Sequence, residues 1–215
     1  MNEPIAVLAG TPVDTQMGAE RLRQKGLTAL TFPLSQTPRE QTEFQLSPSE
    51  KKTAEARSVL EAAERRGCRR AFVYCNSLSA AVDFPALAKE TGVRIVTPLD
   101  VYRDLAPRYR KLGVAAANAQ GLAGIEKAML AANPALEIQG VCSLSVVESI
   151  ETGTDPAALV ERHRLAEIAG WFSGCGMEAL VLGCTHFPYF KAALSSRTSL
   201  PLIDPAEEMI SLLLA

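Results

Sequence analysis

Short apolar segments, each the length of one β-strand, alternate with longer helix-forming stretches along the chain. Polar and apolar residues do not alternate within these segments, which is typical of parallel strands that helices cover on both faces. The expected strands span residues 5–9, 28–32, 71–74, 93–96, 114–117, 137–141, 179–182 and 202–203. The pattern therefore predicts an α/β fold with mainly parallel sheets.

Two segments that contain proline indicate where helices begin. Ser47-Pro48-Ser49-Glu50 combines an N-cap serine, a proline at the first helical position and a capping-box glutamate. We expect that helix to run towards Arg66 and to stop at Gly67. Asp155-Pro156 predicts a second start of the same kind, and Gly174 follows the expected end of that helix.

The composition narrows the class of protein. The 215 residues are 47% hydrophobic, enough for one large domain or two smaller lobes that each bury a core. Charged residues make up 21% and the formal net charge is -2, so we expect no binding to nucleic acid or to an anionic membrane. The opening segment MNEPIAVLAG has no basic stretch and only a strand-length apolar run, which predicts neither a secretory signal nor a membrane span. We therefore expect a cytoplasmic protein with small soluble partners.

The cysteines are five in number, widely spaced, with no CxxC pair and no cluster with histidine. This spacing predicts neither a disulfide framework nor a metal site. Cys68, Cys142 and Cys175 lie before or at the ends of apolar strands and are interpreted as small core residues. Cys75 and Cys184 differ, because hydrogen-bonding residues follow each of them at once.

The surroundings of these two cysteines repeat along the chain. A helix, Gly67-Cys68, the strand AFVY and Cys75 occur in the first half, and a helix, Gly174-Cys175, the strand ALVL and Cys184 occur in the second. The repeat predicts two similar Rossmann-like lobes. Because ligands bind beyond the carboxyl ends of parallel strands, we expect both thiols at one site between the lobes.

Two opposed thiols suit the inversion of a carbon centre. One group must remove a proton from one face of the carbon, and another must deliver a proton to the opposite face. The reference pKa of cysteine, about 8.5, lies close enough to neutrality for a thiol to serve as acid or as base after modest tuning. The positions of Cys75 and Cys184 therefore indicate proton transfer at carbon.

Two motifs at these cysteines resemble a known family. The segments CNS at Cys75 and GCTHFP at Cys184 resemble the aspartate/glutamate racemase superfamily, and GCTHFP looks specifically like glutamate racemase. The segment LIDPAEE resembles the stretch where those enzymes return to their first lobe. VDTQMG resembles the family's Asp-Ser-Gly-x-Gly loop, which places Asp14 on the aspartate, Thr15 on the serine and Gly18 on the later glycine.

The resemblance implies an amino-acid racemase that needs no cofactor. Its first lobe would be residues 1–96 plus 201–215 and its second lobe residues 97–200, with the active site between them. A homodimer is also expected on this ground alone. The implied site residues are Cys75, Cys184, Asp14 beside Cys75, and His186 with Glu148 beside Cys184, while Asn76, Ser77, Thr15 and Thr185 hold the substrate's carboxylate and ammonium groups.

Some segments depart from the family pattern. FPLSQTPREQTEF replaces the tyrosine-glycine loop of glutamate racemases, so the amino acid that would be bound stays open. In VAAANAQG, Ala117 and Gln120 stand in place of the family's threonines, and Asn118 is the candidate for the missing hydrogen bond. Asp14 could instead cap a helix, and Glu148 could be a solvated helix residue.

Other functions remain open for the same fold. Related enzymes of the superfamily include hydantoin racemases and maleate isomerase-like enzymes. A ligand-binding module with idle thiols is a third possibility, because a fold does not fix a function.

Overall fold

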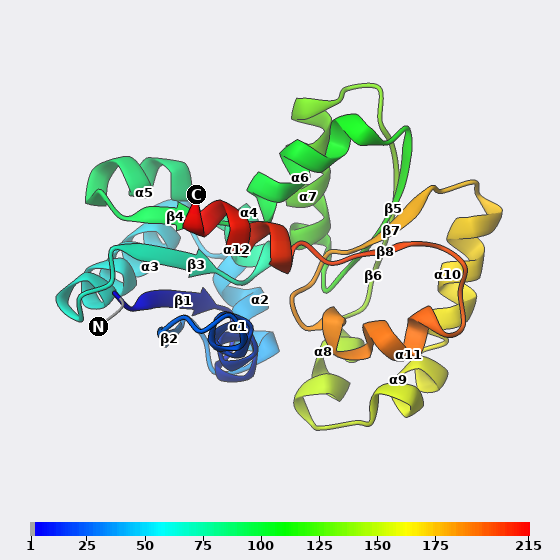
Figure 1. The fold of residues 1–215 in the computed structure, drawn as a ribbon, viewed down its shortest axis with the longest axis horizontal. Coiled ribbons are helices and arrows are strands. Elements are labelled where there is room, and N and C mark those ends of the chain that lie inside the picture. Colours follow the sequence, from blue (N-terminus) through cyan, green and yellow to red (C-terminus); the bar gives the residue numbers. More distant parts are fainter. Residues whose placement is uncertain (1–2) are drawn as a thin grey trace.

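The chain forms two four-stranded sheets in which every strand pair is parallel (Figure 1). The computed structural model describes residues 3–215. The sheet of the first lobe has the order β2-β1-β3-β4, and that of the second lobe β6-β5-β7-β8. The strands are β1 Ile5–Ala9, β2 Ala29–Pro33, β3 Arg70–Val73, β4 Arg94–Val96, β5 Lys111–Ala116, β6 Glu137–Cys142, β7 Ala179–Leu182 and β8 Leu202–Ile203. The predicted fold of two α/β lobes is confirmed.

Helices flank both sheets. Those up to the start of β5 are α1 Pro12–Gln24, α2 Pro38–Leu46, α3 Ser49–Arg65, α4 Asn76–Ala81, α5 Phe84–Thr91 and α6 Pro98–Leu105, followed by the 3₁₀ helix η1 Ala106–Arg108. The later ones are α7 Ala119–Ala132, α8 Leu144–Glu151, α9 Pro156–Arg162, α10 Leu165–Gly174, the 3₁₀ helix η2 Phe187–Phe190, α11 Lys191–Ser195 and α12 Ala206–Leu214. No helix within residues 3–215 is both long enough and apolar enough to span a bilayer.

One predicted helix start is right and one is shifted. Asp155 caps α9, because its Oδ1 accepts hydrogen bonds from two backbone N–H groups at 2.9 and 3.1 Å. Ser47 does not cap α3: its hydroxyl donates to the Phe44 carbonyl at 2.7 Å, at the end of α2, and α3 begins only at Ser49. Arg164 adopts the left-handed conformation with φ 52°, which divides the helix expected after Asp155 into α9 and α10.

The structure contains the predicted repeat of helix, glycine, strand and cysteine, but a different glycine takes part in the second copy. Gly67 follows α3 with φ 83°, and Gly176, not Gly174, takes the matching place after α10 with φ 76°. Gly174 is instead the last residue of α10. Cys68 is buried as expected, but Cys175 is half-buried and Cys142 is exposed, so interpreting all three as core residues was wrong.

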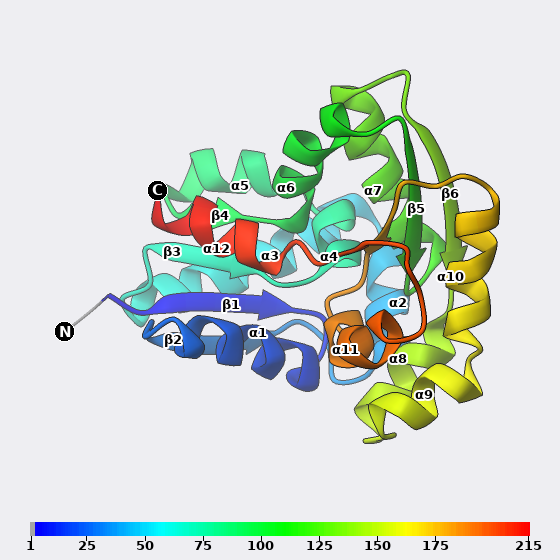
Figure 2. The same cartoon turned by 45° about the vertical axis from the view of Figure 1, so that its right-hand side comes forward.

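The C-terminal segment returns to the first lobe later than the sequence suggests. β8 pairs with β7 and belongs to the second sheet, whereas residues from 201 onwards were expected in the first lobe. The return is made by α12, which lies against β3 and β4 (Figure 2). Its Met209, Ile210 and Leu213 join the core of the first lobe, because their apolar side chains recur on one helical face. Asp204, just before α12, forms an ion pair with Arg21 of α1 at 3.0 Å.

Gly18 allows α1 to pack closely on Tyr74, and its replacement by alanine tests that contact. A Cβ atom at Gly18 would lie 2.8 Å from the Tyr74 side chain. We expect Gly18→Ala to lower the free energy of unfolding by about 1–3 kcal/mol, the usual cost of overpacking. The matched control is Gly170→Ala in α10, where no atom lies within 4 Å of the added Cβ. This control should raise stability by up to about 1 kcal/mol. Urea denaturation measures both, and an unchanged Gly18→Ala midpoint would contradict the close packing.

Candidate active site

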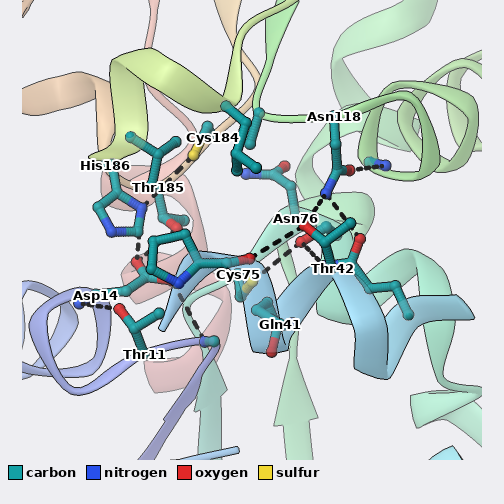
Figure 3. A pocket seen from close by; sticks show the side chains of 18 of the residues that line it. Thr11, Asp14, Gln41, Thr42, Cys75, Asn76, Asn118, Cys184, Thr185 and His186 are labelled. Atoms are coloured by element: carbon teal, nitrogen blue, oxygen red, sulfur yellow. Dashed lines mark hydrogen bonds and ion pairs between the residues drawn. The ribbon is translucent and has the colours of Figure 1, made fainter. Parts of the chain in front are cut away.

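A pocket lies between the two lobes, where the carboxyl ends of both sheets meet (Figure 3). The space inside it that the centre of a water-sized sphere can reach is about 30 Å³, so the lining residues lie close around a narrow cavity. The residues that line it follow β1, β3, β5 and β7 or belong to α2 and α8. They are Gly10, Thr11, Asp14, Pro38, Gln41, Thr42, Gln45, Cys75, Asn76, Ser77, Ala117, Asn118, Gly121, Leu144, Val147, Gly183, Cys184, Thr185 and His186.

The two predicted thiols reach this pocket from different lobes. Cys75 follows β3 at the start of α4, and Cys184 follows β7, and both side chains are buried. The Sγ atom of Cys75 lies 3.6 Å from the Ser77 hydroxyl. Burial raises the pKa of the Cys75 thiol, and the nearby Asp14 carboxylate raises it further, against the opposing hydrogen bond from Ser77. Cys75 is therefore held as a neutral thiol near pH 7.

Cys184 has a cationic neighbour instead. Its Sγ atom lies 3.7 Å from Nδ1 of His186, and Nε2 of His186 donates to Glu151 at 2.9 Å. Burial alone lowers the pKa of His186, but the Asp14 carboxylate and the bonds to Cys184 and Glu151 outweigh it and raise that pKa well above its usual value. The imidazole is therefore protonated near neutral pH. Its positive charge lies beside the Cys184 sulfur.

Asp14 lines the pocket and forms hydrogen bonds with residues of both lobes. It lies in the first turn of α1, whose N-cap is Thr11, so capping is not its main contact. One carboxylate oxygen accepts from the Thr185 hydroxyl at 2.7 Å, and the other accepts from the Gly10 N–H at 3.4 Å. Burial raises the pKa of Asp14, while His186, Thr185 and Gly10 oppose that rise.

The structure replaces Glu148 by Glu151 as the acidic partner of His186. Leu144 and Val147 of α8 line the pocket, and the same face continues at Glu151, four residues after Val147. Glu148 lies on another side of the helix and is exposed. Glu151 also accepts a short hydrogen bond from the Thr11 hydroxyl of the first lobe.

Thr15 is likewise displaced from the predicted role. It is fully buried, its hydroxyl donates to the Thr11 carbonyl inside α1, and it does not line the pocket. The N-cap residue Thr11 occupies the pocket wall instead. Of the two site residues matched to the family-like loop, Asp14 lines the pocket and Thr15 does not.

Of the amide residues predicted to bind substrate, Asn76 has a free donor. Its Oδ1 accepts from the Tyr102 hydroxyl at 2.7 Å, while its buried Nδ2 has no hydrogen-bond partner among the described residues. An unpaired buried donor costs about 1–3 kcal/mol, so Asn76 is suited to an acceptor on a ligand. Ser77 and Asn118 also line the pocket, but both are hydrogen-bonded to Gln45.

The residues from α2 were missed by sequence reasoning. Thr37 caps this helix by accepting from the Glu40 N–H at 3.1 Å, and the Glu40 side chain accepts from the Gln36 N–H at 2.8 Å. Thr37-Pro38-Arg39-Glu40 has the sequence pattern of a capping box, although Glu40 bonds to the residue before the N-cap. Reading it would have placed a helix here, with Gln41 and Gln45 on one face.

Metal binding has no visible basis in the described residues. Within 3–215 no three histidine, cysteine, aspartate or glutamate side chains are grouped so that they could hold a metal ion.

Comparison with known proteins gives consistent matches. The family described as Asp/Glu/Hydantoin racemase matches residues 16–213. Glutamate racemase from Thermus thermophilus is 31% identical over 147 residues, covering 66% of this chain and 53% of that protein. Glutamate racemase from Beutenbergia cavernae is 28% identical over 159 residues, covering 70% of this chain and 53% of that protein. The chain thus matches about half the length of these curated relatives.

Solved structures share the whole fold. Glutamate racemase from Francisella tularensis, in complex with D-glutamate, superposes with a TM-score of 0.74 at 19% identity, covering 99% of this chain and 81% of that one. An aspartate racemase homologue from Pyrococcus horikoshii gives a TM-score of 0.67 at 16% identity, covering 99% of this chain and 97% of that one. At such identities the likeness concerns the arrangement of the two lobes.

Proposed function

This chain belongs to the Asp/Glu/Hydantoin racemase family, and from that premise we propose that it is an isomerase that inverts the α-carbon of an amino acid without a cofactor. The observation that supports this most is the pair of buried thiols, Cys75 and Cys184, that enter one pocket from different lobes. Their surroundings differ, because Cys75 is buried near the Asp14 carboxylate and Cys184 lies beside the His186 imidazolium, and this difference suits separate acid and base roles.

The proposed proton transfers use this difference directly. Cys184, as a thiolate beside the His186 imidazolium, removes the α-proton from one face of the substrate. Cys75, as a neutral thiol, delivers its proton to the opposite face. For the other enantiomer the two cysteines exchange roles, and proton exchange with water restores the starting state.

The remaining pocket residues orient the substrate in this proposal. Asn76 donates its free Nδ2–H to the α-carboxylate. The Asp14 carboxylate attracts the ammonium group, with Thr185 holding Asp14 in place. Glu151 keeps His186 protonated and oriented, the role that the sequence assigned to Glu148.

The alternatives from the same family fit Asp14 less well. A hydantoin ring and maleate carry no ammonium group to pair with a buried carboxylate. An ammonium group would add a second cation beside the buried Asp14 carboxylate, next to the His186 imidazole 3.8 Å away, so Asp14 favours an amino acid over either of these substrates. A non-catalytic binding module would not require the two thiols to differ in their surroundings.

The decisive experiment is incubation with L-amino acids in deuterated water without added cofactor. We expect α-deuterium incorporation by mass spectrometry together with loss of optical rotation for at least one acidic amino acid. The panel contains aspartate, glutamate, and neutral and basic amino acids. A Cys75→Ala/Cys184→Ala double variant, purified in parallel, controls for contaminating racemase. Absence of exchange with every amino acid would exclude the proposed reaction.

A cytoplasmic location and a homodimer also belong to this proposal. The location follows from the expectation drawn from the sequence. The homodimer rests on the family resemblance, and analytical ultracentrifugation tests the assembly.

A further inference from the structure

One end of the pocket is lined by Gln41, Thr42 and Gln45 of α2 and by Asn118, the N-cap residue of α7. We call this end the distal wall. Gln45 joins the two lobes there. Its Nε2 donates to the Ser77 hydroxyl at 2.8 Å, and its Oε1 accepts from Asn118 Nδ2 at 3.0 Å. Both polar atoms of this buried amide are therefore occupied by protein.

Asn118 uses both hydrogens of its Nδ2 within the protein. Its Nδ2 also approaches the Thr42 hydroxyl at 3.4 Å, and its Oδ1 accepts from the Gly121 N–H at 2.9 Å, which caps α7. A substrate group that extended past Gln45 would have to separate Gln45 from Asn118 and so break this bridge between the lobes. The distal wall thus limits the length of the substrate side chain.

Within the distal wall, Gln41 offers a free hydrogen-bond donor. Its side chain is 6% exposed, and its Oε1 accepts from the Ser35 hydroxyl at 3.0 Å. Its Nε2 is buried without a hydrogen-bond partner among the described residues. The Gln41 side chain packs directly against Gly10, because a Cβ atom added to Gly10 would lie 2.9 Å from Gln41 Cγ.

The pocket therefore holds two buried amide groups with unused donors, Asn76 Nδ2 and Gln41 Nε2. Among its described lining residues there is no lysine or arginine. A ligand that satisfies both amides carries two acceptor groups. A buried donor that lacks an acceptor on the ligand is penalised, so neutral side chains are disfavoured.

We infer that the preferred substrate is the acidic amino acid with the shorter side chain, aspartate rather than glutamate. The α-carboxylate binds Asn76, the β-carboxylate binds Gln41, and the Gln45–Asn118 hydrogen bond closes the space beyond. This inference rests on the proposed racemase function and adds the substrate to it. One surplus methylene against a closed wall is worth about 10- to 200-fold in kcat/KM.

The test compares kcat/KM for the racemisation of aspartate and of glutamate. In the wild-type protein we expect aspartate to be favoured by about 10-fold or more. Gln45→Ala removes the bridge and opens the distal wall, so the ratio of glutamate to aspartate activity should rise by about 10-fold. Gln41→Leu should raise KM for aspartate more than it lowers kcat. Gln36→Ala, an exposed glutamine just before α2, is the matched control and should leave the ratio unchanged.

The outcomes separate this inference from the proposed function. No α-proton exchange with any amino acid would refute both. Wild-type exchange of glutamate at least as fast as aspartate, or exchange confined to neutral or basic amino acids, would overturn the aspartate preference and leave racemisation standing. The wild-type comparison decides the point even if Gln45→Ala does not fold. If it folds, circular dichroism confirms this, and an unchanged ratio would also count against the distal wall.

Discussion

Cys75→Ala and Cys184→Ala are each expected to lower the racemisation rate by about 10²- to 10⁴-fold, the usual contribution of a positioned acid or base. Each variant loses the group that serves one face of the α-carbon, and the pocket shows no other thiol to replace it among its described lining residues. The loss should appear in kcat for both directions of the reaction. Chiral chromatography of D- and L-products measures it.

The two variants should also differ from each other in a specific way. The remaining thiol can still remove the α-proton of one enantiomer and return a deuteron from solvent to the same face. We therefore expect residual deuterium incorporation without inversion, for opposite enantiomers in the two variants. Cys142→Ala, at an exposed thiol outside the pocket, is the control and should behave as the wild type. Exchange of the same enantiomer by both variants would refute the assignment of one thiol to each face.

The fold could be predicted from the sequence because buried parallel strands appear directly as apolar segments. β7 and β8 have the bounds that were expected, and β5 differs chiefly because its ladder starts at Lys111. Helix ends were less predictable. Ser47 could cap α3 or end α2, and only the packed structure shows that it bonds to Phe44.

The site residues that follow strands were predicted more accurately than those inside helices. Cys75, Asn76, Cys184 and His186 lie just after β3 or β7, and the parallel topology brings such positions together. A motif match does not show which side of a helix faces the pocket. The carboxylate that bonds to His186 therefore belongs to Glu151, three residues after the predicted Glu148.

The sequence did not predict the distal wall, and the reason differs from the one that applies to Glu151. Gln41 lies in the segment 32–44, which stands in place of the family's tyrosine-glycine loop, and Gln45 follows directly after it, so the family pattern assigned neither residue to the site. Their pocket positions depend on α2 docking between the lobes, where Gln45 bonds to Asn118, 73 residues further along the chain. Long-range contacts of this kind leave no local trace in a single sequence.

Asp14→Asn is expected to lower kcat/KM by about 10- to 150-fold, since a hydrogen bond to a charged group contributes about 1.5–3 kcal/mol. The variant should also change the pH dependence of kcat/KM. The Asp14 carboxylate is among the groups that raise the pKa of His186, so the variant should have a lower His186 pKa. The imidazolium beside Cys184 exists below that pKa and is lost as the pH rises through it. The alkaline limb of the kcat/KM profile should therefore move to lower pH.

The chain has only two histidines, which makes the shift directly measurable by NMR titration of their ring protons. His163 bonds to Ser149 outside the pocket, and burial lowers its pKa, so its titration is the internal control. In Asp14→Asn the His186 midpoint should fall while the His163 midpoint stays in place. If both midpoints are unchanged although activity falls, Asp14 acts on the substrate ammonium and not through His186. A variant with wild-type activity and an unshifted His186 would remove Asp14 from the mechanism altogether.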